Sequence, residues 1–502
     1  MRRGSEIRTR AHSRWLGGST LSDLTDFARA VLFSPSYAND LAGVNNAMHL
    51  DRIRIQGFHS IRDLTFEPED LSVLVGPNNA GKSNLVRAIE FLSDTYGNGL
   101  ESALAEHGGI GNVLFRGPTQ EDIALQFEIE VSLSGNEALG PEDSNGSLYN
   151  MVSTVDSSPL VSIKHKFRVE AIGQGNLAFP TVQNEELEVS TRANDIVQPV
   201  LHFFSPKGTS ISVRQWQSSN AALPDSFFLR PSLFRTSDAP PTEVNGRAYS
   251  EHELPFVYEE PHRRELAIGK LRLFSQILKA FTLQFSTIRL YSFIPVVARQ
   301  PASPFYLRDL GPDGRNLPTL IYRFQNAEED SWSEVIRALF EVSPELESVA
   351  ADFGEDGNLS LRFEERVGET VLRRSATEVS DGTIRSLAMF AALFDPTAPV
   401  VAFEEPENSL HPWAIRAFIN ACRRTIRHGK KQVILTTHSP VVLDSLVPEN
   451  VFVMWRNRSE TMLQRLVEID PDADRLWREG SATLFDLIDS GWVRAAIPGG
   501  VS

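Results

Sequence analysis

The segment Gly76-Pro77-Asn78-Asn79-Ala80-Gly81-Lys82-Ser83 determines the fold that the sequence predicts. It follows the compact apolar run 71–75, which is typical of a buried strand. Apolar residues then recur at helical spacing after it, at Leu85, Ala88, Ile89 and Leu92. The whole unit is therefore predicted to be a strand, a glycine-rich loop and a helix, which is the setting that a phosphate-binding loop requires.

This loop has the chemistry of a nucleotide site. Its glycines allow backbone N–H groups to turn inward around phosphate oxygens, and the helix N-terminus adds partial positive charge. Lys82 would reach the β- and γ-phosphates, and Ser83 would ligate Mg²⁺. Lysine is much rarer than arginine in this chain, so a chance match at Lys82 is less expected. The predicted nucleotide-binding residues are Gly76, Asn78, Asn79, Ala80, Gly81, Lys82 and Ser83.

A pair of carboxylates follows a second strand. The run 399–403 is apolar without alternation, as in strands buried on both faces of a parallel sheet, and it ends in Glu404-Glu405-Pro406-Glu407. Glu404 could hold Mg²⁺ through its water shell, and Glu405 could orient or deprotonate an attacking water. An acidic cluster after a strand is usually a solvated turn, but its pairing with a phosphate-binding loop favours a catalytic role.

Two further sites carry candidate residues. Residues 432–437 predict a further buried strand that leads into His438, which could sense the γ-phosphate or be structural. Ser380-Asp381-Gly382-Thr383 precedes the apolar run 384–394, so it forms a helix N-terminus suited to an anion. Within one chain this is only a helix cap, and a functional role needs a second copy of the protein to bring a nucleotide to it.

The motifs together resemble the head of ABC-type ATPases, in the RecF-like branch that includes chromosome-maintenance heads, overcoming-lysogenization-defect nucleases and many AAA-family predicted ATPases. The resemblance rests on 76–84 and 404–412, with weaker matches at 55–58 and 310–317. It implies that Lys82 and Ser83 are Walker A residues, Glu404 the Walker B acid, Glu405 the catalytic glutamate and His438 the switch histidine. Ser380 and Gly382 would be the signature that contacts the nucleotide of a partner copy, and 408–410 the loop across the dimer seam.

The sequence departs from this family pattern in two places. Walker B more often has aspartate where this chain has Glu404. The signature lacks a double glycine, and Asp381 would repel a γ-phosphate unless its side chain points away.

Composition narrows the class of protein. The chain has 502 residues, a net charge of -16, 41% hydrophobic residues and a single cysteine, Cys422. These values exclude a disordered or fibrous chain, and an internal disulfide is impossible. The longest apolar run, 387–394, is far shorter than a membrane helix, so we expect a cytoplasmic protein without membrane contact. The acidic balance argues against coating nucleic acid by charge alone, although a local basic patch remains compatible with it.

The predicted fold class is α/β, a P-loop NTPase of the ABC ATPase-head type with a mixed β and helical insertion. We expect a poorly ordered extension at 1–47, the N-terminal part of the head at 48–134, the insertion at 135–285 and the C-terminal part of the head at 286–502. Alternation predicts strands at 123–133 and 160–172, with short ones at 199–204 and 210–213. Residues 221–234 are ambiguous, and 262–285 predicts one long, mostly buried helix.

Two basic clusters could touch nucleic acid. They are Arg263, Arg264, Lys270 and Arg272, and then Arg423, Arg424, Arg427, Lys430 and Lys431. The second cluster ends a predicted helix, where cations complement the helix dipole, so a solvated or structural role is favoured over DNA binding.

These features predict an ATPase that binds ATP and Mg²⁺ and works as a nucleotide-gated homodimer in DNA repair or phage defence. An alternative from another class is a weakly hydrolysing regulatory or scaffold subunit for a separately encoded nuclease or toxin. A third option is a repair ATPase that acts directly on DNA. A P-loop kinase is disfavoured, because Glu404, Glu405 and His438 would then have no role.

Overall fold

The computed structural model describes residues 48–117, 124–133, 160–173, 178–193, 196–206, 211–216, 242–244, 247–254, 264–272, 275–304, 309–427 and 431–489. The extension at 1–47 and the segment 221–234 lie outside them. The described residues divide between two compact units. The larger unit takes in those within Ala42–Ser292, Asp395–Asn408 and Ile419–Ser502, and the smaller unit takes in those within Phe293–Phe394 and Ser409–Phe418.

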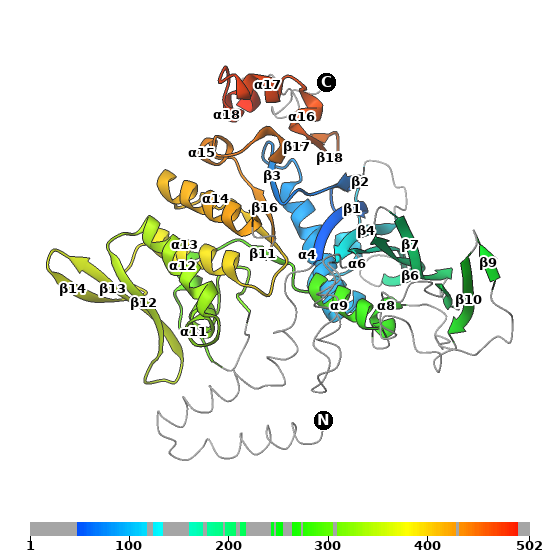
Figure 1. Ribbon diagram of the computed structural model, residues 1–502, viewed down its shortest axis with the longest axis horizontal. Coiled ribbons are helices and arrows are strands. Elements are labelled where there is room, and N and C mark those ends of the chain that lie inside the picture. The colour runs from blue at the N-terminus through cyan, green and yellow to red at the C-terminus, as the bar shows by residue number, and fades with distance from the viewer. Residues whose placement is uncertain are drawn as a thin grey trace, which may run out of the picture. The chain divides into compact units, whose positions relative to one another are not determined.

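A six-stranded, mainly parallel sheet organises the larger unit (Figure 1). Its spatial order is β11 (Arg289–Tyr291), β15 (Val400–Glu404), β16 (Gln432–Thr436), β3 (Leu71–Val75), β17 (Val451–Asn457) and β18 (Glu460–Arg465), and only β18 is antiparallel to its neighbour. All residues of β3 and β16 are buried, as is typical of central strands covered on both faces. Because β3, β15 and β16 are parallel neighbours, the loops that follow them emerge at one edge of the sheet.

A second, antiparallel sheet of nine strands belongs to the same unit. Its order is β2 (Ile61–Phe66), β1 (Met48–Phe58), β4 (Leu125–Leu133), β5 (Leu160–Ile172), β6 (Phe179–Ala193), β7 (Ile196–Pro206), β8 (Ile211–Trp216), β10 (Arg247–Leu254) and β9 (Thr242–Val244). Buried and half-buried residues alternate along β4, so one face of this strand points into the core.

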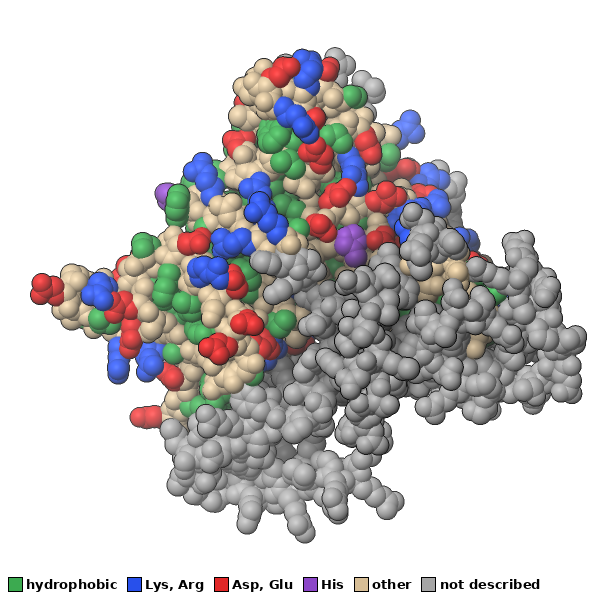
Figure 2. All heavy atoms as spheres, viewed as in Figure 1, with side chains coloured by type: hydrophobic (Ala, Val, Ile, Leu, Met, Phe, Trp, Pro, Cys, Tyr) green, Lys and Arg blue, Asp and Glu red, His purple; other side chains and the backbone are tan. Residues whose placement is uncertain are grey.

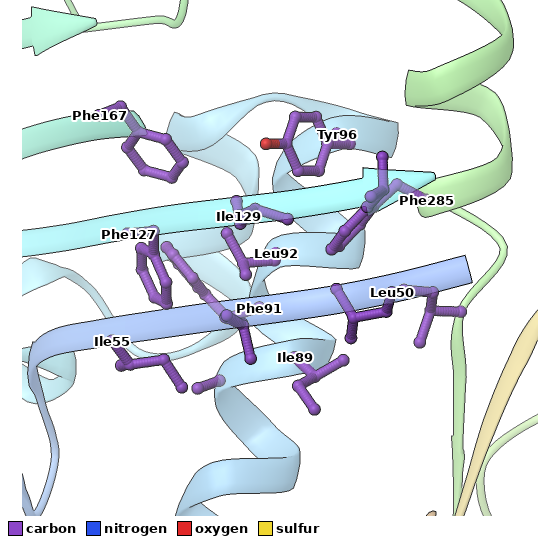
Figure 3. Packing of buried hydrophobic residues seen from close by; sticks show 14 of the residues in the cluster. Leu50, Ile55, Ile89, Phe91, Leu92, Tyr96, Phe127, Ile129, Phe167 and Phe285 are labelled. Atoms are coloured by element: carbon purple, nitrogen blue, oxygen red, sulfur yellow. The ribbon is translucent and has the colours of Figure 1, made fainter. Parts of the chain in front are cut away.

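The helix that follows the phosphate-binding loop packs into this core. It is α4 (Lys82–Asn98), and all four apolar residues used to predict it are buried. Figure 3 shows Ile89, Phe91 and Leu92 of α4 packed with Leu50 and Ile55 of β1, Phe127 and Ile129 of β4 and Phe285, all members of one buried apolar cluster. The loop is thus anchored by a helix that is fixed over much of its length.

A buried polar chain connects α4 to the inserted strands. The Tyr96 hydroxyl of α4 lies 2.6 Å from Nδ1 of His165 on β5, and His165 Nε2 lies 3.2 Å from Oε1 of Glu185 on β6. Glu185 also accepts hydrogen bonds from the backbone N–H groups of Ala267 (2.6 Å) and Ile268 (3.0 Å). Burial raises the pKa of the Tyr96 hydroxyl well above its ordinary value, so it stays protonated and can donate to His165. His165 then donates from Nε2 to the carboxylate.

Replacing Glu185 by alanine should lower the free energy of unfolding by about 3–5 kcal/mol, because it leaves buried partners without their acceptor. His165 and the Ala267 and Ile268 amides would all lose a hydrogen bond. Urea unfolding followed by circular dichroism measures the change. Glu188→Ala is the matched control, since Glu188 lies on the same strand but is exposed. Equal stability of the two variants would contradict the structural role of Glu185.

Among its described residues, the smaller unit contains four whole helices and a three-stranded sheet. The helices are α10 (Pro295–Ala298), α11 (Leu317–Ala327), α12 (Glu329–Val342) and α13 (Asp381–Phe394). The sheet has the order β12 (Leu346–Phe353), β13 (Leu359–Val367) and β14 (Thr370–Ser375). Residues 383–393 of α13 are all buried, so its N-terminal turn is the part that reaches the surface.

The remaining elements are short apart from one helix. That helix is α14 (Pro412–Arg427), whose residues are shared between the two units. The others are α5 (Leu100–Glu106), α6 (Ile110–Val113), α15 (Pro440–Leu443), the 3-10 helix Pro448–Asn450, α16 (Leu466–Ile469), α17 (Ala473–Arg478) and α18 (Leu484–Asp489). No helix among the described residues is long and apolar enough to cross a membrane.

The prediction of one long helix over 262–285 is wrong. The structure has α8 (Ile268–Leu271) and α9 (Gln276–Phe285) instead. Ser275 separates them: its backbone is extended, and its side chain accepts a hydrogen bond from the Leu278 N–H and so starts a new helix. The predicted strands are confirmed as β4, β5, β7 and β8, with β7 longer on both sides than predicted and β8 extending to Trp216.

Candidate functional site

The phosphate-binding loop between β3 and α4 has a backbone that its two glycines make possible. Gly76 and Gly81 have φ angles of 149° and 104°. A Cβ at Gly76 would lie 2.0 Å from the Met454 carbonyl oxygen, and one at Gly81 would lie 2.2 Å from Thr461 Oγ1. Both positions therefore require glycine for conformation and for space. The glycine spacing that identified the motif in the sequence has this physical cause.

Side chains around Gly81 hold the start of α4 in place. Asn84 Nδ2 donates to Ser60 Oγ over 2.6 Å, and Ser60 Oγ is 2.7 Å from Thr461 Oγ1. Arg456 Nη1 donates to Asn79 Oδ1 over 3.3 Å, and Asn79 has a left-handed φ of 67°. Sequence reasoning missed the supporting contacts of Ser60, Thr461 and Arg456, because none of the three belongs to a motif. Thr461 and Arg456 also lie far along the chain from the loop.

Lys82 is the only charged side chain of the loop and is almost fully buried. Its Nζ donates to the carbonyl oxygens of Gly76 (2.7 Å) and Pro77 (3.2 Å) and lies 2.9 Å from His438 Nε2. Burial lowers the pKa of Lys82 to about 8, against the opposite effect of Glu405 and Glu407. An ammonium group that is poorly solvated in this way gains most from an anionic ligand.

The two predicted carboxylates lie at the end of β15, next to β16. Glu404 is paired with Thr436 in the parallel register of these strands. The chain changes direction at Glu405, directly after β15 ends. The φ angle of Glu405 is 44°, and its N–H donates to the Thr436 carbonyl over 3.0 Å. A non-glycine residue in this region is held there by its surroundings, which is common at functional sites. The Glu405 carboxylate accepts a hydrogen bond from Asn408 Nδ2 over 2.9 Å.

Glu407, the third acid of the cluster, has a structural task. Its Oε1 accepts hydrogen bonds from Thr437 Oγ1 (2.7 Å) and from the His438 N–H (3.0 Å). It thereby fixes the loop that carries His438. The His438 Nε2 lies 4.0 Å from Glu405 Oε1 and next to Lys82. Burial, helped by the Lys82 charge, lowers the pKa of His438, which favours a neutral imidazole that accepts from the Lys82 ammonium.

These residues enclose one cleft within the larger unit. It is lined mostly by polar groups, from Asn78, Asn79, Ala80, Gly81, Lys82, Ser83, Asn84, Ser292, Glu404, Glu405, Asn408, Thr436 and His438. The structure thus brings together the predicted loop, both predicted carboxylates and the predicted histidine. Ser292 and Thr436 are additions. Thr436 could have been found, because it ends the strand predicted beside Glu404, whereas Ser292 follows a short strand that carries no motif.

The donor set of the cleft fits Mg²⁺. Glu404 Oε1 is buried and has no hydrogen-bond partner among the described residues. The Ser83 hydroxyl lines the same cleft. A buried carboxylate oxygen without a partner costs free energy unless it binds a cation or water, and Mg²⁺ prefers carboxylate, hydroxyl and phosphate oxygens. Ser83 and Glu404 would hold the ion beside the nucleotide phosphates, where it would neutralise developing charge.

The signature residues lie in the smaller unit, at the N-terminus of α13. Ser380 Oγ accepts a hydrogen bond from the Thr383 N–H over 3.1 Å and is 2.8 Å from Thr383 Oγ1, so Ser380 caps the helix. A Cβ on Gly382 would lie 3.3 Å from the Ser409 carbonyl oxygen. The cap that the sequence predicts is therefore present, and a role in binding a second copy's nucleotide stays a prediction.

Most described arginines of the two basic clusters have partners within the protein. Arg264 pairs with Glu101 and lies over the Phe179 ring, and Arg272 donates to the Tyr96 carbonyl. Arg423 donates to the Ser445 carbonyl, and Lys431 is buried and donates to the Asp395 carbonyl over 2.5 Å. Figure 2 shows acidic and basic side chains interspersed on the face in view. These contacts support a structural role for the two basic clusters over a role in binding nucleic acid.

One further group of side chains has the composition of a metal site. Glu186, Glu188 and His202 lie together on β6 and β7. In the strand register, however, Lys166 is opposite Glu186, Lys164 is opposite Glu188 and Arg214 is opposite His202. His202 Nε2 is already 3.0 Å from Glu186 Oε1. Three neighbouring cations favour ion pairing on this face over a bound metal.

Comparison with known proteins finds ATPase families that match the two parts of the chain from which the cleft is built. Residues 48–172 match the family described as "AAA ATPase domain", and residues 277–444 match the family described as "AAA domain, putative AbiEii toxin, Type IV TA system". The chain is 27% identical over 116 residues to the "DNA replication and repair protein RecF" of Prosthecochloris aestuarii. That match covers 23% of this chain and 31% of the relative, so the chain spans about a third of the relative's length.

The solved structures that the chain matches include heads of SMC proteins. One is an SMC head bound to the C-winged helix domain of ScpA, with a TM-score of 0.44 and 14% identity over 83% of this chain and 97% of that one. Another is the Pyrococcus furiosus SMC head bound to the C-terminal domain of ScpA, with a TM-score of 0.42 and 13% identity over 87% of this chain and 100% of that one.

The two family matches contain the motifs that form the cleft. The match at 48–172 contains the phosphate-binding loop, and the match at 277–444 contains the two carboxylates. The parallel sheet, with the loop and the carboxylates at the ends of neighbouring strands, is an α/β P-loop fold. These matches support an AAA/ABC-type, RecF-like ATPase as the kind of protein that the chain resembles.

Proposed function

We propose that the protein binds MgATP in this cleft and hydrolyses it to ADP and phosphate, as a dimer that closes on the nucleotide. The observation that carries the proposal is the convergence of Lys82, Glu404, Glu405 and His438 around one cleft. Lys82 and the loop amides hold the phosphates, and Ser83 and Glu404 hold the ion. Glu405 is the base that activates water, and His438 reports the γ-phosphate.

In the proposed dimer, each copy supplies a second contact to the nucleotide that the other copy holds. The helix cap formed by Ser380 and Gly382 lies in the smaller unit and has the geometry of an anion site. In the proposed dimer it contacts the γ-phosphate held by the partner's loop, and the Ser409 segment lies at the seam. Binding energy from both copies is then available only when nucleotide is present, which makes closure depend on ATP.

The test is the rate of phosphate release per protomer, measured with MgATP over a range of protein concentrations. A dimeric site predicts that the rate per protomer rises with protein concentration and then levels off. Excess EDTA should abolish turnover, and Glu405→Gln protein prepared in parallel sets the background from contaminants. A rate per protomer that is constant, together with a monomer in sedimentation at saturating ATP, would refute the dimer.

A second candidate is a regulatory subunit that binds ATP and hardly hydrolyses it, while it holds a separately encoded nuclease or toxin. The family description for 277–444, which names a toxin–antitoxin system, favours it. Tight ATP binding without turnover above the Glu405→Gln background would support this candidate. Addition of duplex DNA distinguishes a repair role, because direct action on DNA predicts salt-sensitive stimulation of turnover.

A further inference from the structure

The signature carries a carboxylate at a position where the proposed function requires a phosphate to approach. Asp381 is the first residue of α13, between Ser380 and Gly382, and its side chain is 57% exposed. A helix N-terminus attracts anions, and an unpaired carboxylate there competes with an incoming phosphate and repels it.

Arg299 forms an ion pair with the Asp381 carboxylate. Its Nη2 donates to Asp381 Oδ1 over 2.5 Å, which makes a charge-assisted hydrogen bond. The Arg299 side chain is only 16% exposed, and its Nε is buried with no hydrogen-bond partner among the described residues. The guanidinium is thus held largely within the protein, while the carboxylate that it neutralises lies at the surface.

The backbone that carries Arg299 is fixed on both sides. Arg299 follows α10, and its N–H donates to the Pro295 carbonyl over 3.1 Å. The turn at 311–316 packs against α10 so closely that a Cβ on Gly314 would lie 2.8 Å from the Ala298 Cβ. Gly314 has a φ of 93°, and the Ile294 N–H donates to the Asp313 carbonyl over 3.0 Å. The weak sequence motif at 310–317 therefore acts as a support for α10.

α13 also holds this segment from the other direction. Arg385, which lies one turn into α13, donates from Nη1 to the Phe293 carbonyl just before α10 over 2.9 Å. α10 and the first turn of α13 are thus joined by two arginines, one from each side. This makes the position of Arg299 relative to the signature well defined.

We propose that Arg299 is a positioning residue of the half-site that one copy offers to its partner's nucleotide. It neutralises Asp381 and turns the carboxylate away from the anion site, so that Ser380 and Gly382 meet the γ-phosphate without a repulsive charge. Ser380 Oγ accepts from the Thr383 N–H and lies 2.8 Å from Thr383 Oγ1. When the Thr383 hydroxyl is the donor in that second contact, the Ser380 proton is available to a phosphate oxygen. The role rests on the proposed dimer.

The experiment uses full-length protein in the Glu405→Gln background and measures the ATP concentration that gives half-maximal dimerisation. Arg299→Gln should raise this concentration about tenfold or more, since a like charge now faces the phosphate. Asp381→Asn should lie within about threefold of the parent, and Arg299→Gln/Asp381→Asn should return to that range because the repulsion is gone. Arg299→Lys should retain most of the parent's dimerisation, because it keeps the positive charge.

Two controls separate this role from general damage. Arg362→Gln removes an ion pair with Asp352 (3.0 Å) elsewhere in the smaller unit and should leave dimerisation unchanged. Binding of a fluorescent ATP analogue to monomers at low protein concentration should be equal in all variants, since that site is complete in one copy.

The outcomes that overturn the proposal are distinct from those that overturn the dimer. A parent protein that stays monomeric with ATP refutes the dimer and the role of Arg299 together. A parent that dimerises, with Arg299→Gln unchanged, refutes only the role of Arg299. A double variant as impaired as Arg299→Gln also refutes it, because the arginine would then act on something other than Asp381.

Discussion

Replacing Glu405 by glutamine should lower steady-state ATP turnover by about 10²–10³-fold while ATP binding persists. A positioned general base contributes about 10²–10⁴-fold to a rate, and glutamine keeps the size of the side chain but cannot accept a proton. The carboxylate lies at the cleft, 2.9 Å from Asn408 Nδ2 and 4.0 Å from His438 Nε2. Glutamine can still accept the Asn408 hydrogen bond, so the loop should keep its shape.

A coupled phosphate-release assay at saturating MgATP measures the turnover, and sedimentation with ATP measures assembly. If the base is lost but the nucleotide stays bound, the ATP-bound dimer should accumulate in the variant and dissociate in the wild type as ATP is consumed. Glu460→Gln is a suitable control, because Glu460 of β18 pairs with Arg62 of β2 and neither residue lines the cleft. Wild-type turnover in Glu405→Gln protein would assign the base to another residue.

The parts of the site that are local in sequence could be predicted from it. The loop between β3 and α4 is recognisable because its two glycines serve a backbone that other residues cannot adopt, and those constraints leave a pattern of fixed spacing. β15 and β16 are recognisable because the central residues of a strand buried on both faces are apolar without alternation. Once both strands are predicted to be parallel, the meeting of Glu404 and Glu405 with the loop follows from the geometry of the sheet.

The parts that depend on distant residues could not be predicted. No sequence pattern marks Tyr96, His165 and Glu185, which lie singly on a helix and two strands. Only the fold shows that they form a chain of hydrogen bonds in the core. Arg299 lies 82 positions before Asp381, in a segment without a motif. The helix over 262–285 was mispredicted because apolar density continues across Ser275, although a serine can cap a new helix.

Replacing Lys82 by alanine should weaken ATP binding by about 30-fold or more. Truncating one partner of a buried, hydrogen-bonded charge pair costs about 2–5 kcal/mol, and 1.4 kcal/mol corresponds to a factor of ten. Lys82 is 7% exposed, so little water compensates for the loss of its contact with the phosphates. Its carbonyl partners at Gly76 and Pro77 would also lose the group that draws the loop together.

The same substitution should change the stability of the nucleotide-free protein much less than it changes binding. Burial already disfavours the charged form of Lys82, as its pKa of about 8 indicates, and alanine removes that cost together with the hydrogen bonds. Calorimetric titration with MgATP and thermal unfolding measure the two effects, and Arg87→Ala, at an exposed position on the same helix, is the control.

The two variants then distinguish binding from turnover at one cleft. Lys82→Ala should fail to bind and therefore fail to dimerise with ATP, whereas Glu405→Gln should bind and dimerise without turning over. Binding by Lys82→Ala protein within about threefold of wild type would place the phosphates away from the loop, because a lysine so deeply buried cannot lose its phosphate contact at so small a cost. The assignment of Glu405 would then fail as well, since that carboxylate shares a cleft with the loop.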